Sequence, residues 1–209
     1  MIFSGETRAE TFLYEYGRGL YINLTNRCPC DCTFCIRGQV QGVGNAGSLW
    51  LEEEPTAEQV ILGLGEVVPA EYDEVVFCGF GEPMCALDVL TQVCRHLKSR
   101  SGCPPIRLNT NGLGDLINQR PTAPLLEGLI DIVSISMNAP DKDKYMKIVR
   151  PTFGEIAFDA MLDFAISCKQ VLPKVQFSVV SVLPPDDMAA CREISDRLGI
   201  PLRVREFGS

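Results

Sequence analysis

Residues 21–35 of this chain read YINLTNRCPCDCTFC, and this stretch decides the fold. In residues 21–25 polar side chains alternate with apolar ones, a period of two that is typical of a strand with one polar face. The residues that follow hold four cysteines within eight positions: Cys28, Cys30, Cys32 and Cys35. This thiol loop directly follows the predicted strand, at the end where parallel α/β folds place their chemistry.

Downstream of this stretch, apolar runs alternate with helical patterns. The strands predicted after the first are residues 74–78, 106–109, 132–137, 175–182 and 202–206. One helix is predicted to open at Thr56, where Gln59 three residues later completes a capping box. The other predicted helices are residues 87–98, 141–148, 155–170 and 187–198. Strands and helices in this order predict a parallel sheet or barrel.

The predicted strands also share a polar face opposite an apolar one. The polar sets are Arg107, Asn109 and Asn111; Ser134, Ser136 and Asn138; and Arg203 with Arg205, which flank Val204. A closed eight-stranded barrel is filled by Val, Ile and Leu, so six strands with polar faces predict an open, partial (β/α)6 barrel of the TIM type with a wet interior. The alternative is an open doubly wound sheet, whose strands normally read as near-continuous apolar runs.

Length and charge limit the function classes. The 209 residues fit one domain, and we expect residues 1–209 to form it, with residues 1–20 as an extension or hairpin before the first strand. The net charge of −8 argues against a direct nucleic acid partner, because phosphate binding favours a basic face. The N-terminus lacks a signal-peptide pattern, and no apolar run approaches the roughly 18 residues of a spanning helix. We therefore expect a cytoplasmic protein with no membrane partner.

The chain has ten cysteines, and without a secretory signal they favour metal or redox chemistry over a disulfide framework. Thiolates at the spacing of Cys28, Cys32 and Cys35 can surround one soft metal centre. Cys30 adds a fourth thiol to the same loop, so a zinc site or a fully ligated cluster is the alternative.

The spacing of Cys28, Cys32 and Cys35 resembles the signature of radical SAM enzymes, and Phe34 matches the aromatic residue usual in that signature. The resemblance implies that the three cysteines hold three irons of a 4Fe-4S cluster. It also implies that the fourth iron binds the amino and carboxylate groups of S-adenosylmethionine (SAM). The family does not require a cysteine at Cys30, which would be a spectator or a ligand in a damaged or resting form.

Further segments resemble the family in the expected order, each near the end of a predicted strand. The resemblance implies SAM-binding roles for Gly79, Phe80, Gly81 and Glu82 at the amino group; for Asn109 and Asn111; for Ser134, Ser136 and Asn138 at the ribose and carboxylate; and for Arg150 at the carboxylate or a substrate anion. A glycine backbone permits close approach, and a carboxylate suits an ammonium. The alternatives are an ordinary strand-ending turn, hydrogen-bonded polar residues inside the barrel, and a solvated surface arginine.

A closer resemblance is to the small radical SAM proteins that are associated with TatD-family nucleases. The segments that carry it are residues 23–28, 34–37, 77–83, 133–136 with 138–140, and 150–154. This resemblance implies a genomic neighbour and not a reaction.

The family resemblance implies reductive cleavage of SAM to methionine and a 5′-deoxyadenosyl radical, which takes a hydrogen atom from a substrate under oxygen-poor conditions. No catalytic residue beyond the cluster and SAM is predicted. The substrate, a small molecule or peptide, is unknown, and the electron would come from a donor such as flavodoxin or ferredoxin. We expect the chain to be too short for cysteine-rich extensions with further clusters. The alternatives are ring chemistry like that of carboxy-deazaguanine synthase, and a non-catalytic zinc or iron-sulfur binding module.

The last predicted strand suggests an anionic substrate. Arg203 and Arg205 share one face of it, and a buried arginine needs an anionic partner. The planar guanidinium suits a carboxylate or phosphate. The alternative is that both arginines pair with acidic residues of neighbouring strands or lie at an exposed sheet edge. The outlying cysteines Cys78, Cys85, Cys94 and Cys103 are expected to pack in the interior.

Overall fold

The computed structural model describes residues 12–207, and within that range seven strands form one sheet in chain order. β1 and β2 form an antiparallel hairpin, and every later pair of neighbours is parallel. The two edges are β1 and β7, so the predicted open, partial barrel is confirmed, with a hairpin strand before the six predicted ones. The strands are β1 Leu13–Tyr16, β2 Gly19–Ile22, β3 Glu74–Phe77, β4 Ile106–Thr110, β5 Ile132–Ser136, β6 Lys174–Val180 and β7 Leu202–Arg205.

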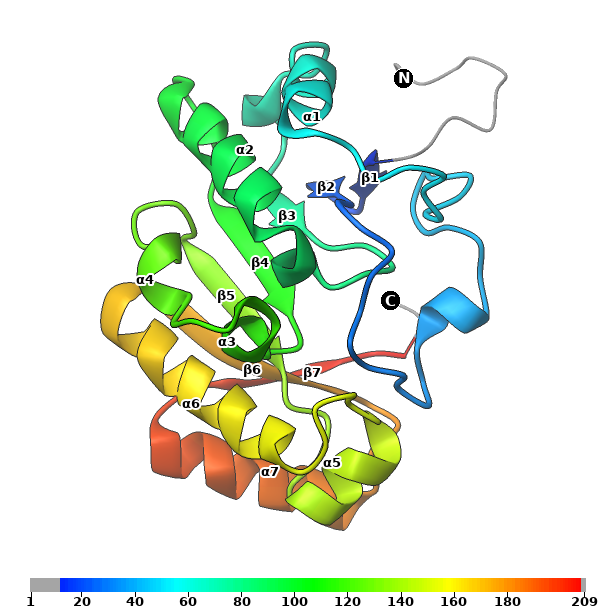
Figure 1. Ribbon diagram of the computed structural model, residues 1–209, viewed down its shortest axis with the longest axis vertical. Coiled ribbons are helices and arrows are strands. Elements are labelled where there is room, and N and C mark those ends of the chain that lie inside the picture. Colours follow the sequence, from blue (N-terminus) through cyan, green and yellow to red (C-terminus); the bar gives the residue numbers. More distant parts are fainter. Residues whose placement is uncertain (1–11, 208–209) are drawn as a thin grey trace.

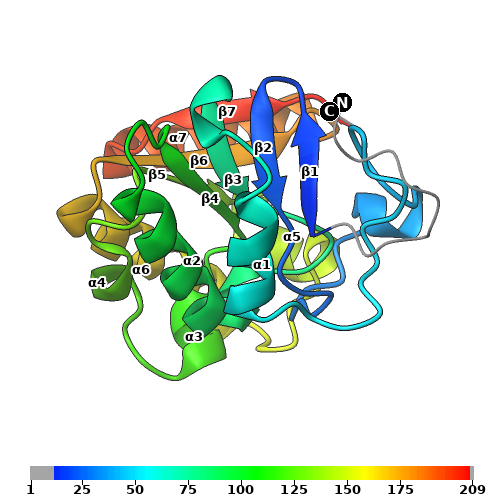
Figure 2. The same ribbon diagram turned by 90° about the horizontal axis from the view of Figure 1, so that it is seen from above.

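Helices connect the parallel strands and cover one side of the sheet. Figure 1 shows α2 and α6 along that side, and in both views the loop between β2 and α1, drawn in blue to cyan, lies away from them (Figure 2). The α-helices are α1 Ala57–Leu64, α2 Leu87–Ser99, α3 Gly114–Asn118, α4 Ala123–Leu126, α5 Lys142–Ile148, α6 Ile156–Val171 and α7 Pro185–Leu198; the 3-10 helices are η1 Ile36–Gly38, η2 Pro69–Glu71 and η3 Pro83–Ala86. Across residues 12–207 no helix combines the length and the apolar character that crossing a bilayer requires.

The alternation of side chains in the strands separates a helix-covered face from an inner face. In β4, Ile106 and Leu108 are fully buried in the main apolar cluster. Arg107 and Asn109 therefore project from the opposite, inner face. The main cluster combines the apolar strand residues with helix residues such as Leu90 and Phe164. The core thus lies between sheet and helices, and the polar side chains are left for the inner face.

The inner face is aromatic at the hairpin end. Tyr14, Leu49 and Phe80 form a second, smaller buried cluster, against which Tyr16 and Tyr21 pack. The rings of Tyr14 and Tyr21 are 5.2 Å apart. This cluster joins β1 and β2 to the loops that follow β2 and β3, so the inner face is polar only beyond the hairpin.

The first predicted strand is displaced in the structure. Residues 21–25 were expected to form it, but β2 ends at Ile22. Asn23 and Thr25 are buried and bonded through their side chains instead. The Asn23 amide donates to the carbonyl of Leu49 over 2.7 Å, and the Thr25 hydroxyl donates to Glu54. These side-chain bonds draw the backbone away from the sheet after Ile22.

The apolar residue of the last strand, Val204, does not belong to the main core. Val204 is 36% exposed, and Arg203 beside it is exposed as well. The reason is that β7 is an edge strand, and within residues 12–207 no strand pairs with its outer side. The expected extension or hairpin in residues 1–20 falls largely on residues 1–11, which lie outside the described residues; of the rest, β1 pairs with β2.

The capping box of α1 allows a test of the fold. The Thr56 hydroxyl accepts from the Gln59 amide, and the Gln59 side chain accepts from the Thr56 amide. Thr56→Ala removes the first bond and is expected to lower the free energy of unfolding by about 1 kcal/mol in urea titrations. Thr56→Ser keeps the hydroxyl and should remain close to the wild type. An unchanged urea midpoint in Thr56→Ala would contradict the role of the cap.

Candidate functional site

The predicted site residues meet at the carboxyl ends of neighbouring parallel strands. The cysteine loop follows β2, and Gly79, Phe80, Gly81 and Glu82 follow β3. Asn109 is the last residue but one of β4, and Asn111 comes just after the strand. Ser134 and Ser136 belong to β5, and Asn138 follows it. Since β2, β3, β4 and β5 are successive neighbours, their ends form one continuous rim.

The start of the cysteine loop is held by the segment before α1. Arg27 forms a two-pronged ion pair with Glu54, with Nε and Nη2 at 2.9 and 2.7 Å from its two oxygens. The Asn26 side chain donates to the Leu51 carbonyl over 2.7 Å and accepts from the Leu51 amide over 3.1 Å. Four side-chain bonds therefore fix the direction in which the chain leaves β2.

The far side of the loop is held by the segment after α5. Cys30 and Pro151 form an antiparallel bridge, and the Thr152 amide donates to the Pro29 carbonyl over 2.8 Å. The Thr33 amide donates to the Ile148 carbonyl over 2.9 Å. The loop is thus clasped between the sheet and residues 148–152.

Arg150, predicted to contact SAM or a substrate anion, lies in that clasping segment. Its backbone has a φ of 50°, a left-handed conformation that is uncommon for a residue other than glycine. Its exposed guanidinium is 3.6 Å from a carboxylate oxygen of Asp31 in the cysteine loop. In this structure Arg150 therefore binds the loop and not a buried anion site.

The thiols of Cys28 and Cys30 interact with each other. The interaction with Cys30 lowers the pKa of Cys28, whereas the interaction with Cys28, followed by burial, raises the pKa of Cys30. The Asn111 amide nitrogen lies 4.0 Å from the sulfur of Cys28 and 3.6 Å from that of Cys30. Cys30, the departure from the family pattern, is buried beside Cys28 rather than turned away.

The remaining two thiols of the loop are partly buried. Burial, followed by the negative charge of Cys28, raises the pKa of Cys32 to about 12. The amide of Cys35 donates to the Cys32 carbonyl over 3.0 Å, so the two follow one another in a tight turn. Phe34 between them is also partly buried. Within residues 12–207 no three Cys, His, Asp or Glu side chains are gathered in a metal-binding arrangement.

The glycines after β3 are required by protein contacts. A Cβ on Gly79 would overlap the side-chain oxygen of Asn23. A Cβ on Gly81 would overlap the backbone carbonyl of Thr25 and would lie 2.8 Å from that of Arg27. Next to it, the Glu82 amide donates to the Arg27 carbonyl over 2.8 Å. Gly79 and Gly81 therefore allow this turn to pack closely against the start of the cysteine loop.

Glu82 is buried and largely occupied by protein donors. Its Oε1 accepts from the Thr110 hydroxyl at 2.7 Å and the Met84 amide at 3.1 Å, and its Oε2 accepts from the Asn111 amide at 2.7 Å. Burial and then the charge of Cys28 raise the pKa of Glu82 to about 7, against these bonds. A carboxylate oxygen has two lone pairs, so Oε2 keeps one for a further donor.

Two buried polar atoms near the rim have no hydrogen-bond partner in the described residues. One is Oδ1 of Asn138, whose residue is 4% exposed and has a φ of 55°. The other is the hydroxyl of Tyr145 in α5, whose pKa is raised by burial and then by the nearby thiols Cys30 and Cys32. A buried polar atom is normally satisfied, so each marks a place that a ligand can complete.

Other predicted site residues have protein partners. The Ser134 hydroxyl accepts a hydrogen bond from the side-chain amide of Gln176 in β6 over 3.3 Å. The Phe80 ring lies in the small aromatic cluster, 5.2 Å from the ring of Trp50. Ser136 is partly buried at the end of β5.

Sequence reasoning missed two residues of this site. Glu54 is joined to Thr25 and Arg27 across a long loop, and no local pattern relates them. Tyr145 was predicted only as part of a helix. In the structure it is fully buried, and its hydroxyl is close enough to Cys30 and Cys32 for their charges to affect its pKa. The one available signal for Glu54 was its position two residues before the helix cap at Thr56.

The outlying cysteines differ from one another. Cys94 lies in the main core as predicted. Cys85 and Cys103 are only partly buried. Cys78, just after β3, is partly buried as well, and burial raises its pKa before the charges of Arg205 and Arg107 act on it. It lies outside the main apolar core.

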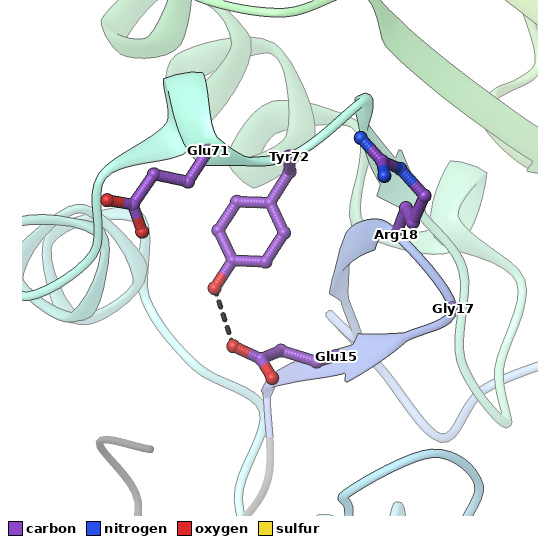
Figure 3. A pocket seen from close by; sticks show the side chains of 5 residues that line it. All are labelled: Glu15, Gly17, Arg18, Glu71 and Tyr72. Atoms are coloured by element: carbon purple, nitrogen blue, oxygen red, sulfur yellow. Dashed lines mark hydrogen bonds between the residues drawn. The ribbon is translucent and has the colours of Figure 1, made fainter.

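A surface pocket lies away from this site. It is lined by Glu15, Gly17, Arg18, Glu71 and Tyr72 (Figure 3). The Tyr72 hydroxyl donates to Glu15 over 2.6 Å across it. Gly17 and Arg18 form the turn between β1 and β2, at the amino end of β2, whereas the cysteine loop follows its carboxyl end. The pocket is thus separate from the rim.

Comparisons with known proteins agree with this arrangement. The model of a family described as the Radical SAM superfamily matches residues 22–202. A GTP 3′,8-cyclase of Lactiplantibacillus plantarum is 25% identical over 175 residues, which are 84% of this chain and 48% of that protein. A probable dual-specificity RNA methyltransferase RlmN of Gloeobacter violaceus is 28% identical over 138 residues, which are 65% of this chain and 36% of that protein. The chain matches less than half the length of each.

A solved structure supports the fold. The crystal structure of Streptococcus suis SuiB bound to S-adenosylmethionine superposes with a TM-score of 0.68. The superposition covers 93% of this chain and 41% of that chain, at 16% sequence identity. At this identity the likeness concerns the fold alone.

The contact of Gly81 with the start of the cysteine loop can be tested by substitution. Gly81→Ala forces a Cβ against the carbonyls of Thr25 and Arg27, so we expect it to lower the free energy of unfolding by about 1–3 kcal/mol in urea titrations. Gly38→Ala is the matched control, because a Cβ there meets no atom within 4 Å. Equal stability of the two variants would show that the turn does not press on the loop.

Proposed function

The chain belongs to the radical SAM superfamily, and on that premise we propose that it uses a 4Fe-4S cluster to cleave SAM reductively and so to act on a substrate by radical chemistry. When bound, these groups supply a 5′-deoxyadenosyl radical that removes a hydrogen atom from the substrate. The observation that carries the proposal is the position of the cysteine loop at the carboxyl end of β2. There it meets the turn after β3 and the Asn111 side chain after β4.

Cys28, Cys32 and Cys35 are the residues that we propose as iron ligands. Their sulfur atoms are soft donors of the kind that binds iron-sulfur clusters. The clasp formed by Glu54 and residues 148–152 supports this role, because it holds the loop while the thiols adjust to a metal. Asn111, within 4.0 Å of the Cys28 sulfur, is suited to donate a hydrogen bond to a metal-bound thiolate.

We propose that SAM is held along the rim. The remaining lone pair of Glu82 Oε2 is suited to its ammonium group, beside the backbone of Gly79, Phe80 and Gly81. The orphan Oδ1 of Asn138 is suited to a ribose hydroxyl. Asn109, Asn111, Ser134, Ser136 and Phe34 are proposed to line the same site. Arg150 is retained as a contact only if its exposed ion pair with Asp31 opens when SAM binds.

The chain spans less than half the length of the two relatives that it matches, so their activities do not define its reaction. We propose that it forms a single radical SAM core domain. Within the superfamily we propose a relationship with the TatD-associated radical SAM proteins, on the segments quoted above. The net charge of −8 favours a small-molecule or peptide substrate over nucleic acid, although one relative is named as an RNA methyltransferase. We also propose a flavodoxin or ferredoxin as the electron donor and a cytoplasmic location for the protein.

Substitutions in the cysteine loop test the proposed function. After anaerobic reconstitution, the wild type should hold about four irons and release 5′-deoxyadenosine from SAM when reduced. Cys32→Ser should lose most of the iron and all cleavage, because a ligand is missing. Cys30→Ser is the matched control and should keep both.

Two results would contradict the proposal. If Cys30→Ser loses the cluster as fully as Cys32→Ser does, the three-ligand assignment is wrong. If the wild type binds one zinc ion and cleaves no SAM, the non-catalytic binding module is the better description. Dependence of turnover on magnesium and a pterin substrate would instead favour chemistry like that of carboxy-deazaguanine synthase.

A further inference from the structure

Two arginines on the inner face of the sheet are incompletely satisfied. Arg107 of β4 is 9% exposed and forms an ion pair with Glu74 through Nη2, but its buried Nε has no partner among the described residues. Arg205 of β7 also has a buried Nε without a partner, and it forms no ion pair within residues 12–207. Buried guanidinium N–H groups normally find acceptors, so two such orphans in one region call for an acceptor.

The two guanidiniums face the same region from different strands. Burial raises the pKa of the Cys78 thiol, and the positive charges of Arg205 and Arg107 both act to lower it. The pKa of Arg205 is lowered, first by burial and also by the positive charges of Arg203 and Arg107. Tyr21 of β2 lies at the same place, since Cys78 and Arg107 both affect its pKa. β5 and β6 separate β4 from β7 in the sheet. The sheet must therefore be curved for arginines of both strands to act on the same thiol.

The nearby carboxylates do not neutralise this region. Glu74 is joined to Arg107. Glu206, next to Arg205 in sequence, accepts a hydrogen bond from the Ser181 hydroxyl over 3.1 Å. Arg203, which shares the inner side of β7, is exposed and so is outside the region. The pair predicted from the sequence is therefore replaced by Arg205 and Arg107.

We propose that Arg205 and Arg107 form a binding site for an anionic group of the substrate, a carboxylate or phosphate, beside Cys78 and Asn109. This inference rests on the proposed function for the identity of the ligand as substrate. The anion would accept hydrogen bonds from the two Nε atoms and would neutralise Arg205, while Arg107 stays tied to Glu74. Guanidinium groups suit both anions because they can donate two parallel hydrogen bonds.

The aromatic cluster of the hairpin supports a site of this kind. Tyr21 connects the region to Tyr14 and Tyr16, whose rings pack on it at 5.2 and 5.8 Å. A ligand anchored at the arginines would thus have an apolar wall on the hairpin side. The rim with Asn138 and Glu82 lies at the carboxyl ends of the strands, whereas Arg107 is near the amino end of β4. Arg107 therefore lies below the rim, while Arg205 is at the carboxyl end of β7.

The experiment uses the full reconstituted protein with inorganic phosphate and succinate as probes. Each probe is titrated calorimetrically at constant ionic strength into the wild type, Arg205→Met and Arg203→Met. At least one probe should bind the wild type and bind Arg205→Met at least tenfold more weakly. Arg203→Met is the matched control, from the same side of the same strand, and should bind as the wild type does. The better probe identifies the class of anion.

Several outcomes would overturn the inference. They are equal binding to the wild type and Arg205→Met, loss of binding in Arg203→Met as well, or no binding to the wild type. A parallel loss of SAM affinity in Arg205→Met would also overturn it, because the anion would then be the SAM carboxylate. If Arg205→Met does not fold, Arg205→Gln replaces it. If that variant also fails, the wild type decides: either probe must raise its melting temperature relative to chloride.

The inference and the proposed function can fail separately. Probe binding that depends on Arg205, without any SAM cleavage by the wild type, would retain the anion site and remove the radical SAM activity. SAM cleavage without such probe binding would retain the activity and remove the anion site.

Discussion

The contact between Gly81 and the start of the cysteine loop is the constraint on which the rest of the site depends. A turn after β3 approaches the carbonyls of Thr25 and Arg27 so closely that no side chain fits between them. The Glu82 amide then donates to the Arg27 carbonyl, and the Glu82 carboxylate accepts from Thr110 and Asn111. One buried residue thereby links the loops that follow β2, β3 and β4.

The cysteine loop is consequently held by contacts that do not involve its thiol groups. Glu54 holds one side through Arg27, and the Cys30–Pro151 bridge holds the other. Neither support uses a cysteine side chain. A loop built in this way can accept a metal without reorganising the sheet, because its supports lie outside the donor atoms. The left-handed backbone of Arg150 belongs to the same clasp.

The inner face of the sheet has a division of its own. The hairpin end is aromatic, and the region next to Tyr21 contains Arg107, Cys78 and Arg205. Ion pairing with Glu74 answers only part of this positive charge. Charge that burial leaves unanswered on an inner face is costly unless a ligand supplies the counter-ion. The inner face therefore has a region of incompletely paired positive charge that is suited to an anion.

The order of the six parallel strands, the open barrel and the thiol loop could be predicted from the sequence, because each depends on a local period or spacing, whereas β1, α3 and α4 were not predicted. Alternation in 106–109 predicted which side of β4 faces the helices, and the Thr56–Gln59 box predicted the start of α1. Only the tertiary structure decided that Glu54 and residues 148–152 hold the loop, that Val204 is exposed, and that Arg107 rather than Arg203 accompanies Arg205. These facts depend on curvature and on edge position, which bring distant residues together and leave no trace in a local pattern.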